Sequence, residues 1–501
     1  MQLTDIFTES NTTILLLLLT PVIGAILVTV LRQKRIAEII TVSSTFLILI
    51  QALVIISKII DEKTMSAFGN MFYIDSLGAV ILLPISIVGF VSALYSVNYM
   101  GRQYDNGMVD AKHITRYYQG FNVFLLTMLV VPIANNLGIM WVTVEATTLI
   151  SVLLIMLYFK QNAIEAAWKY LIIATVGLSF ALIGTTFFYY ANINVGTSTD
   201  AMNWTEMLHN SKLFDPNLVK IAFIFILIGY GTKAGLAPMH TWLPDAHSEA
   251  PTPVSALLSG VLLNCAFYGI LRFHIISSNA IGAAFSNQLL IMLAIISVGI
   301  AAASIYFQKD MKRMLAYSSV EHMGLVSLGI GFGGLFGIYG AILQIINHAI
   351  AKPMMFFVSG TVNQKYETKA MSKITGIIKT MPITGILFMV GGLALVGMPP
   401  FNIFLSEFMI LSSGFKAGQF LATSLVILFL IITFAVFLRH LIRMVFGKPS
   451  PEIKTNEMGK LAIIPVVILG SLVFILGVYV PEQLQVLVHN AVAIISQGGS
   501  T

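Results

Sequence analysis

Stretches of about 20 apolar residues recur along the whole chain, and a helix of that length spans a lipid bilayer. Fourteen such stretches occur within the 501 residues. Their approximate centres are residues 22, 47, 87, 126, 148, 178, 230, 264, 298, 322, 348, 398, 432 and 470. Only 10% of the side chains are charged, far fewer than the roughly 25% of soluble domains. The sequence therefore predicts an all-α, polytopic membrane protein with about 14 transmembrane helices.

Two of the predicted passes, the seventh and the twelfth, are interrupted by glycine and proline. The segment GLAPMHTWLPDA begins at Gly235, and GMPPFNIFLSEF begins 162 residues later at Gly397. Both fit the pattern G-x-x-P-x-x-x-(aromatic)-L-x-(acid) in the same register. Paired, interrupted segments in the two halves of a membrane protein are typical of inverted repeats with a transport path at the broken helices. We therefore predict two related helix bundles, each with one broken helix.

The helices divide the chain into four predicted parts. Residues 1–117 hold helices 1 to 3, and residues 118–275 hold the first repeat, helices 4 to 8. Residues 287–446 hold the second repeat, helices 9 to 13, and residues 460–501 hold helix 14 and a tail. The polar connections are loop-sized, so we expect no soluble domain.

Positive charges are distributed unevenly between the two sets of connections. With the N-terminus outside, 20 of the 28 lysines and arginines fall in connections that face the cytoplasm, and six fall on the opposite side. The remaining two, Lys233 and Lys352, fall inside apolar segments. Because cytoplasmic loops are enriched in lysine and arginine, this bias predicts a multi-pass cell-membrane protein with both termini outside.

Cysteine content and charge exclude several classes of protein. The single cysteine, Cys265, excludes a disulfide framework and a thiolate-held iron–sulfur or zinc site built from this chain alone. The net charge of +6 is spread over short loops, so it implies no nucleic-acid partner. The sequence contains no Walker loop and no C-x-x-C or H-E-x-x-H motif. We expect no metal, no cofactor and no redox chemistry of the chain's own.

Glu145 and Lys233 are ionisable side chains at membrane depth, which makes them candidates for function. One interpretation is a buried ion pair that holds two helices together. The other is a proton site, because opposite charges about 4 Å apart attract by about 4 kcal/mol at an effective dielectric near 20. Movement of Glu145 would then switch Lys233 between holding and releasing its proton. Both interpretations use the same two residues.

His348 and Lys352 lie four residues apart in QIINHAIAKPMMFFVSG and therefore share one helix face. In a structural interpretation, the histidine is hydrogen-bonded and the lysine extends toward the membrane surface. In a functional interpretation, the imidazole relays protons and Lys352 stores a proton in the second half.

Further polar residues near the breaks are candidates for a proton path. Glu407 either caps the second half of its broken helix or passes the proton to solvent. His322, in YSSVEHMG, is either a packed polar contact or a relay. Around the first break, His240 and His247 are relay candidates, and we expect Asp245 to cap a helix.

Four segments together resemble a known family. They are GTKAGLAPMHTWLPDAHSEAPTPVSALLSG, DMKRMLAYSSVEHMG, NHAIAKPMMFFVSG and GMPPFNIFLSEFMIL. They are similar to the antiporter-like membrane subunits of respiratory complex I, of Mrp-type sodium/proton antiporters and of membrane-bound hydrogenases. The resemblance covers about residues 70–445. Within the family, NNLGIMWVTVEATTL and YSSVEHMG look most like component F of the hydrogenase-4 and formate-hydrogenlyase group.

The resemblance implies fourteen helices with two inverted five-helix repeats. It also implies that a glutamate of the fifth helix and a lysine of the broken seventh helix form a charge switch. Glu145 and Lys233 occupy these positions, and Glu407 occupies the position of the exit residue on the twelfth helix. The histidines of the family's central polar axis correspond to His322 and His348.

The eighth helix departs from the pattern of the complex I M chain. That chain has a lysine where this sequence has Asn264, in GVLLNCAFYG. An amide orients water but carries no proton, so a relay between the halves would run through water and the histidines, or through Lys352. This difference places complex I-like pumping in question.

Three functions are compatible with these residues. The leading hypothesis is a proton-translocating, antiporter-like subunit of a redox-driven complex, of hydrogenase-4, formate-hydrogenlyase or complex I-like NADH–quinone oxidoreductase type, whose partner subunits transfer the electrons. The second is sodium/proton exchange in an Mrp-type assembly, with Thr143, Thr147 and Thr148 as compatible sodium ligands. The third is a scaffold with a vestigial proton path, which Asn264 favours and the retained charges at membrane depth disfavour.

Overall fold

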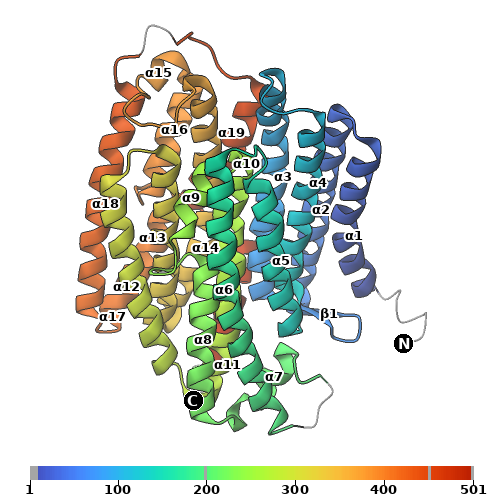
Figure 1. The fold of residues 1–501 in the computed structure, drawn as a ribbon. Coiled ribbons are helices and arrows are strands. Elements are labelled where there is room, and N and C mark those ends of the chain that lie inside the picture. The colour runs from blue at the N-terminus through green and yellow to red at the C-terminus, as the bar shows by residue number, and fades with distance from the viewer. Residues whose placement is uncertain (1–8, 197–199, 450–452, 498–501) are drawn as a thin grey trace.

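Long helices run side by side along one direction and contain most of the chain (Figure 1). The structure is a computed structural model and describes residues 9–196, 200–449 and 453–497. Eleven predicted passes are single helices: α1 (Glu9–Leu31), α2 (Lys34–Glu62), α3 (Ser76–Asp105), α4 (Ala111–Val130), α5 (Leu137–Ile155), α6 (Gln161–Ile193), α12 (Ala284–Phe307), α13 (Met311–Phe332), α14 (Gly334–Tyr366), α18 (Phe420–Phe446) and α19 (Lys460–Val478).

The other three passes are each composed of more than one segment. The seventh is α8 (Pro216–Ala234) followed by α9 (Trp242–Glu249), and the twelfth is α16 (Pro382–Leu395) followed by α17 (Asn402–Lys416). The eighth joins α10 (Thr252–Leu257), a π-helix (Leu258–Leu262) and α11 (Leu263–Ile281). The peptide bonds before Pro238 and Pro400, within the two breaks, are cis.

Membrane-spanning character follows from helix length and hydropathy. Eleven helical stretches of the described chain are long and apolar enough to cross a membrane. The predicted passes outside these eleven are α4 and α13, which carry two and three charged residues, and the α16/α17 pair, whose members are short. The outer helices expose large apolar side chains such as Leu421 and Ile39, which suits contact with lipid. The prediction of an all-α, multi-pass membrane protein is confirmed.

The helix ends follow from local sequence. Asn136 accepts hydrogen bonds from two backbone N–H groups in the first turn of α5, and Asp215 caps α8 ahead of Pro216. Such caps contribute about 1 kcal/mol each. At the other end of α8, Gly235 has φ 78°, a left-handed conformation that glycine adopts without strain.

Close packing between α6 and α8 depends on glycine. A Cβ added to Gly229 of α8 would overlap the backbone nitrogen of Ala181, and one added to Gly184 of α6 would lie 2.8 Å from the carbonyl oxygen of Ala222. Small residues let membrane helices approach closely where no hydrophobic effect drives them together. The eighth pass is buried at the centre of the bundle, since its most apolar window is entirely covered.

Several short elements lie outside the predicted passes. They are the hairpin β1 (Thr64–Ala67) and β2 (Phe72–Asp75), α7 (Trp204–Asn210), α15 (Ile377–Thr380), α20 (Glu482–Gln497) and two 3-10 turns (Val131–Ile133 and Ser211–Leu213). The hairpin and α7 lie at the end of the bundle where α1 begins, and α15 lies at the opposite end (Figure 1). The predicted C-terminal tail thus contains a helix, α20.

A buried ion pair fixes the hairpin to the bundle. The Arg272 guanidinium of α11 donates two hydrogen bonds to Asp75, at 2.7 and 2.8 Å. Neither side chain is more than 3% exposed. Asp75 ends β2 and also caps α3, so a single carboxylate joins three elements.

Candidate functional site

The break in the seventh pass places Lys233 inside the bundle. Lys233 lies in the last turn of α8 and is 0% exposed. Its ammonium donates hydrogen bonds to the Thr148 hydroxyl of α5 at 2.7 Å and to the Tyr170 hydroxyl of α6 at 2.5 Å. Trp242, the first residue of α9, donates through its indole to the Thr232 carbonyl at 2.8 Å. The two halves of the broken helix are therefore joined beside the lysine.

Tyr170 is a site residue that we did not predict. Its hydroxyl contacts the Ser151 hydroxyl at 2.9 Å as well as Lys233. Its ring lies 4.5 Å from the Trp242 ring, measured between centroids. The sequence has 17 tyrosines, and nothing in the segment AAWKYLI distinguishes this one, because its role depends on packing between helices.

Glu145 lies on α5 one turn before Thr148, and its carboxylate is partly buried. One oxygen accepts a hydrogen bond from Thr175 of α6 at 2.8 Å. The other is buried, with no hydrogen-bond partner among the described residues. Hydroxyl groups, and not the Glu145 carboxylate, contact the Lys233 ammonium. Glu145 therefore lies next to the lysine site without forming a direct ion pair in this conformation.

Asn264 lies at the centre of the eighth pass, two residues after the π-helix. Its amide nitrogen donates to the Gly260 carbonyl at 2.7 Å, and its amide oxygen is buried without a described partner. A Cβ added to Gly260 would lie 2.6 Å from the ring of Pro353, so the π-helix packs tightly against α14 next to Lys352. Single π-turns within α-helices occur frequently at functional sites.

His322 and His348 lie together in the second half of the bundle. Their ring centroids are 5.3 Å apart, and both side chains are at most 1% exposed. The Nδ1 atom of His322 is 2.9 Å from the Gln344 amide nitrogen and 4.0 Å from Oε1 of Glu407. Both nitrogens of His348 are buried without a hydrogen-bond partner among the described residues. Helices α13, α14 and α17 thus bring three of the predicted path residues together.

Glu407 lies in the first half of α17 and packs against the second break. A Cβ added to Gly397 would overlap Oε2 of Glu407. Since Gly397 has φ 66°, both its backbone conformation and its surroundings require glycine. The break therefore makes room for the carboxylate.

Lys352 lies on α14 and is 0% exposed. Its ammonium donates to the Leu315 carbonyl at 2.9 Å and to the Ser318 hydroxyl, both of α13. Lys352 is therefore buried inside the bundle. This placement differs from the structural interpretation, in which the lysine extends toward the membrane surface.

Three residues near the first break, His240, His247 and Asp245, make different kinds of contact. His240 is buried and its ring lies 6.0 Å from that of Tyr317. His247 is fully buried, and its ring stacks on Phe356 at 5.2 Å. Asp245 forms ion pairs with Arg313 at 2.6 Å and with Lys169 at 3.5 Å. Asp245 thus links helices by ion pairs, where we expected a helix cap.

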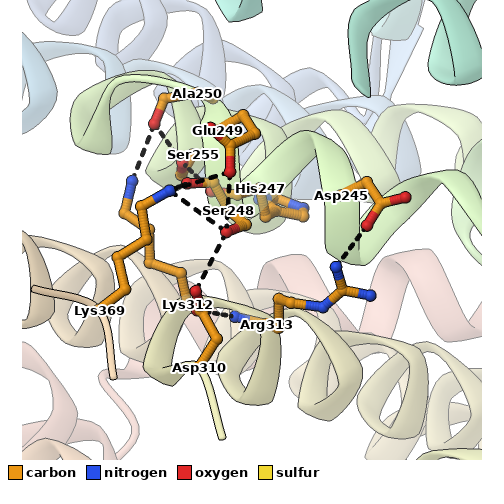
Figure 2. A network of polar contacts seen from close by, with 10 residues as sticks. All are labelled: Asp245, His247, Ser248, Glu249, Ala250, Ser255, Asp310, Lys312, Arg313 and Lys369. Carbon is orange, nitrogen blue, oxygen red and sulfur yellow. Dashed lines mark hydrogen bonds and ion pairs between the residues drawn. The ribbon is translucent and has the colours of Figure 1, made fainter. Parts of the chain in front are cut away.

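A polar network joins the end of α9 to the start of α13. Figure 2 shows Lys312 and Lys369 extending toward the junction of α9 and α10, where Lys312 donates to the Ala250 carbonyl at 2.8 Å. Lys369 donates to the Ser248 carbonyl at 2.6 Å and pairs with Glu249 at 3.0 Å. The network connects the two predicted repeats through charged hydrogen bonds, which are stronger than neutral ones.

Comparison with known proteins gives one consistent assignment. Residues 134–433 match the family described as NADH:quinone oxidoreductase/Mrp antiporter, transmembrane. The chain is 36% identical over 467 residues to a hydrogenase-4 component F homolog of Methylacidiphilum infernorum, an alignment that covers 93% of this chain and 96% of that protein. It is 30% identical to a subunit of the Na(+)/H(+) antiporter of Alkalihalophilus pseudofirmus, covering 81% of this chain and 52% of that longer protein.

A solved structure of similar fold comes from the membrane-bound sulfane sulfur reductase, an archaeal respiratory membrane complex. The TM-score is 0.85 at 27% sequence identity, over 96% of this chain and 97% of that one. The family match and the 36% identical relative each cover more than half of this chain. The chain therefore belongs to the NADH:quinone oxidoreductase/Mrp antiporter family, as an antiporter-like, multi-pass membrane subunit.

Proposed function

We propose that this chain translocates protons as the antiporter-like subunit of a redox-driven membrane complex of hydrogenase-4 or complex I type. The observation that carries the proposal is the burial of Lys233 in a broken helix, where two hydroxyl groups from α5 and α6 hold its ammonium. A buried lysine costs several kcal/mol at membrane depth, and a purely structural contact between helices does not need one. A lysine binds and releases a proton, so this position suits a proton store.

The proposed path runs from Lys233 past Asn264 to His348, His322 and Glu407. Lysine, histidine and glutamate each bind and release protons, whereas the Asn264 amide only orients neighbouring groups. The contacts between His322, His348 and Glu407 support the second part of this path. Residues 118–275 and 287–446 would be the two inverted repeats, each contributing one broken helix.

The partners follow from the relatives. The hydrogenase-4 component F homolog and the sulfane sulfur reductase are named as parts of larger complexes, which supports other membrane and redox subunits as partners of this chain. The excess of lysine and arginine in one set of connections supports an orientation with both termini outside.

The test is proton translocation by the whole complex reconstituted in vesicles. We expect Glu145→Gln and Lys233→Met to lower the number of protons moved per electron while electron transfer by the partner subunits continues. Glu165→Gln and Lys416→Ala alter exposed residues and serve as matched controls with normal translocation. Normal translocation by assembled Glu145→Gln and Lys233→Met complexes would refute the proposal.

Sodium/proton exchange is the second candidate, supported by the 30% identity to a subunit of an Na(+)/H(+) antiporter. The geometry around Glu145 gives it less support, because the Thr148 hydroxyl already accepts a hydrogen bond from the Lys233 ammonium at 2.7 Å, and that positive charge repels a sodium ion. Uptake of radioactive sodium into the same vesicles distinguishes the two functions. Sodium movement coupled to proton movement would favour exchange.

A further inference from the structure

Glu321 is a buried acidic residue that the path described above does not use. It lies on α13, next to His322, and is 3% exposed. Its Oε1 atom is buried without a hydrogen-bond partner among the described residues. Lys352 of α14 and Thr433 of α18 lie near it. A buried carboxylate is costly unless it is paired or functional, so Glu321 requires an explanation.

The sequence around Glu321 repeats the sequence around Glu145. The segment TVEATTLISV spans residues 143–152, and SVEHMGLVSL spans residues 319–328. In this register four positions are identical. They are Val144 and Val320, Glu145 and Glu321, Leu149 and Leu325, and Ser151 and Ser327. The first position of each segment carries a hydroxyl group. The two segments lie on α5 and α13, the second helices of the two proposed repeats.

The contacts around the two glutamates are also alike. Lys233 donates to Thr148, which lies three residues after Glu145 on α5. Lys352 donates to Ser318, which lies three residues before Glu321 on α13. Three residues is about one helical turn, so in each half the lysine ammonium binds a hydroxyl one turn from the glutamate.

A threonine from another helix accompanies each glutamate. Thr175 of α6 donates to Glu145 at 2.8 Å, whereas Thr433 of α18 lies near Glu321 with its hydroxyl buried and unpartnered among the described residues. In each glutamate one carboxylate oxygen is buried and unpartnered among the described residues. Both lysines are 0% exposed. The two halves thus contain the same set of groups, a glutamate, a hydroxyl and a buried lysine.

We propose that Glu321, Ser318 and Lys352 form a second proton-holding site. It contains the same kinds of group as Glu145, Thr148 and Lys233, although Lys352 lies on the unbroken eleventh pass and Lys233 on the broken seventh. This inference rests on the proposed function and assigns to the second half a charge pair of its own. Lys352 binds the proton, and Glu321 is a positioning residue that stabilises the positively charged form of Lys352. Each repeat then holds one proton at its own lysine.

Proton transfer from this site has a defined acceptor. His348 lies one turn before Lys352 on the same face of α14, and both of its ring nitrogens are unpartnered among the described residues. When Lys352 releases its proton, the N–H bond at its Nζ breaks and an N–H bond forms at the imidazole. The positive charge moves to His348, and Glu321 keeps its own charge throughout. The other ionisable groups that face this site are His322, Glu407 and His247.

The test compares Glu321→Gln with Glu145→Gln in the complete reconstituted complex. Removing a nearby opposite charge weakens proton binding by a buried lysine by on the order of tenfold or more. We therefore expect Glu321→Gln to lower the number of protons that the complex moves per electron. Glu321→Asp keeps the charge and should recover part of the loss. In the double variant Glu321→Gln/Lys352→Met, translocation should be no lower than in Lys352→Met alone, because both residues act at one site.

The controls separate this inference from the proposed function. If Glu145→Gln lowers translocation but Glu321→Gln leaves it normal, the second site is refuted and the proposed function stands. If Glu321→Gln and Glu321→Asp reduce assembly equally while protons per electron stay normal, Glu321 is structural and the inference is refuted. If Glu145→Gln and Lys233→Met translocate normally, the proposed function itself fails. Glu165→Gln on the surface of α6 serves as the matched carboxylate control.

Discussion

The hydroxyl of Tyr170 contacts two polar groups at once, the ammonium of Lys233 and the hydroxyl of Ser151. Hydrogen bonds to charged groups contribute about 1.5–3 kcal/mol. Because the Tyr170 ring also packs on Trp242, this residue links Lys233, the proposed proton store, to the second half of the broken helix. It therefore helps to set the position of the Lys233 ammonium.

Tyr170→Phe tests this role at the scale of one atom. The ring and its packing on Trp242 stay, but the ammonium loses one hydrogen bond, so we expect proton translocation by the complex to fall by roughly tenfold, which corresponds to about 1.4 kcal/mol. The measurement is proton translocation at constant electron transfer. Tyr190→Phe, at a residue that is 53% exposed, should leave translocation unchanged, and an equal effect of both variants would contradict the assignment.

Charged residues of the candidate site are easier to recognise in the sequence than the residues that contact them. Glu145, Lys233 and Lys352 are recognisable because charge at membrane depth is rare and costly. Tyr170 and Glu321 were missed for different reasons. The first is a common aromatic residue whose contact comes from another helix, and the second requires comparison of α5 with α13 across an offset of 176 residues.

At the scale of helices, glycine determines how closely α6 and α8 pack. The backbone nitrogen of Ala181 lies 2.3 Å from the position that a Cβ atom of residue 229 would occupy. Because α8 carries Lys233 while α6 carries Tyr170 and Thr175, the distance between these two helices fixes the lysine site. A change in helix packing there acts directly on the proposed chemistry.

Gly229→Val should therefore destabilise the protein. Inserting methyl groups into a packed interface costs about 1–3 kcal/mol, and here the obstructing atoms belong to backbone that cannot rotate away. Thermal unfolding in detergent measures the effect. Gly101→Ala is the matched control, because the nearest atom to its added Cβ is the Lys34 ammonium nitrogen at 3.7 Å. We expect its stability to be equal to or above that of the wild type, since alanine favours helix.

Helix positions are predictable from apolar periodicity, but short elements are not. All fourteen predicted passes coincide with a helix or with consecutive helical segments, because the bilayer requires one run of about 20 apolar residues per crossing. The hairpin Thr64–Asp75 and α20 lack such a run. Their positions depend on contacts such as the Asp75–Arg272 pair, whose members are 197 residues apart.

On the scale of the whole molecule, two clusters of charge hold distant segments together. At one end, Asp75 and Arg272 join the hairpin and α3 to α11. The Arg272 guanidinium also lies 4.2 Å from the centre of the Trp204 ring of α7. Elsewhere, Lys312 and Lys369 bind the junction between α9 and α10 (Figure 2).

Removing one member of the first pair should be strongly destabilising. Asp75→Asn keeps an oxygen for the cap of α3 but leaves Arg272 buried without an anion, which costs about 3–5 kcal/mol. Thermal unfolding or protease resistance in detergent measures the loss. Asp75→Asn/Arg272→Met should recover part of it, because no buried charge then remains unpaired. A double variant less stable than Asp75→Asn would contradict this account.

The network in Figure 2 also limits how early in synthesis the junction of α9 and α10 can form all of its hydrogen bonds. The carbonyls of Ser248 and Ala250 receive their hydrogen bonds from Lys369 and Lys312, which are 121 and 62 residues later in the chain. At about 5–20 residues per second, the ribosome needs roughly 6–24 s to reach Lys369 after making Ser248. The predicted first repeat therefore has two backbone carbonyls that receive these hydrogen bonds only after the first part of the predicted second repeat has been made.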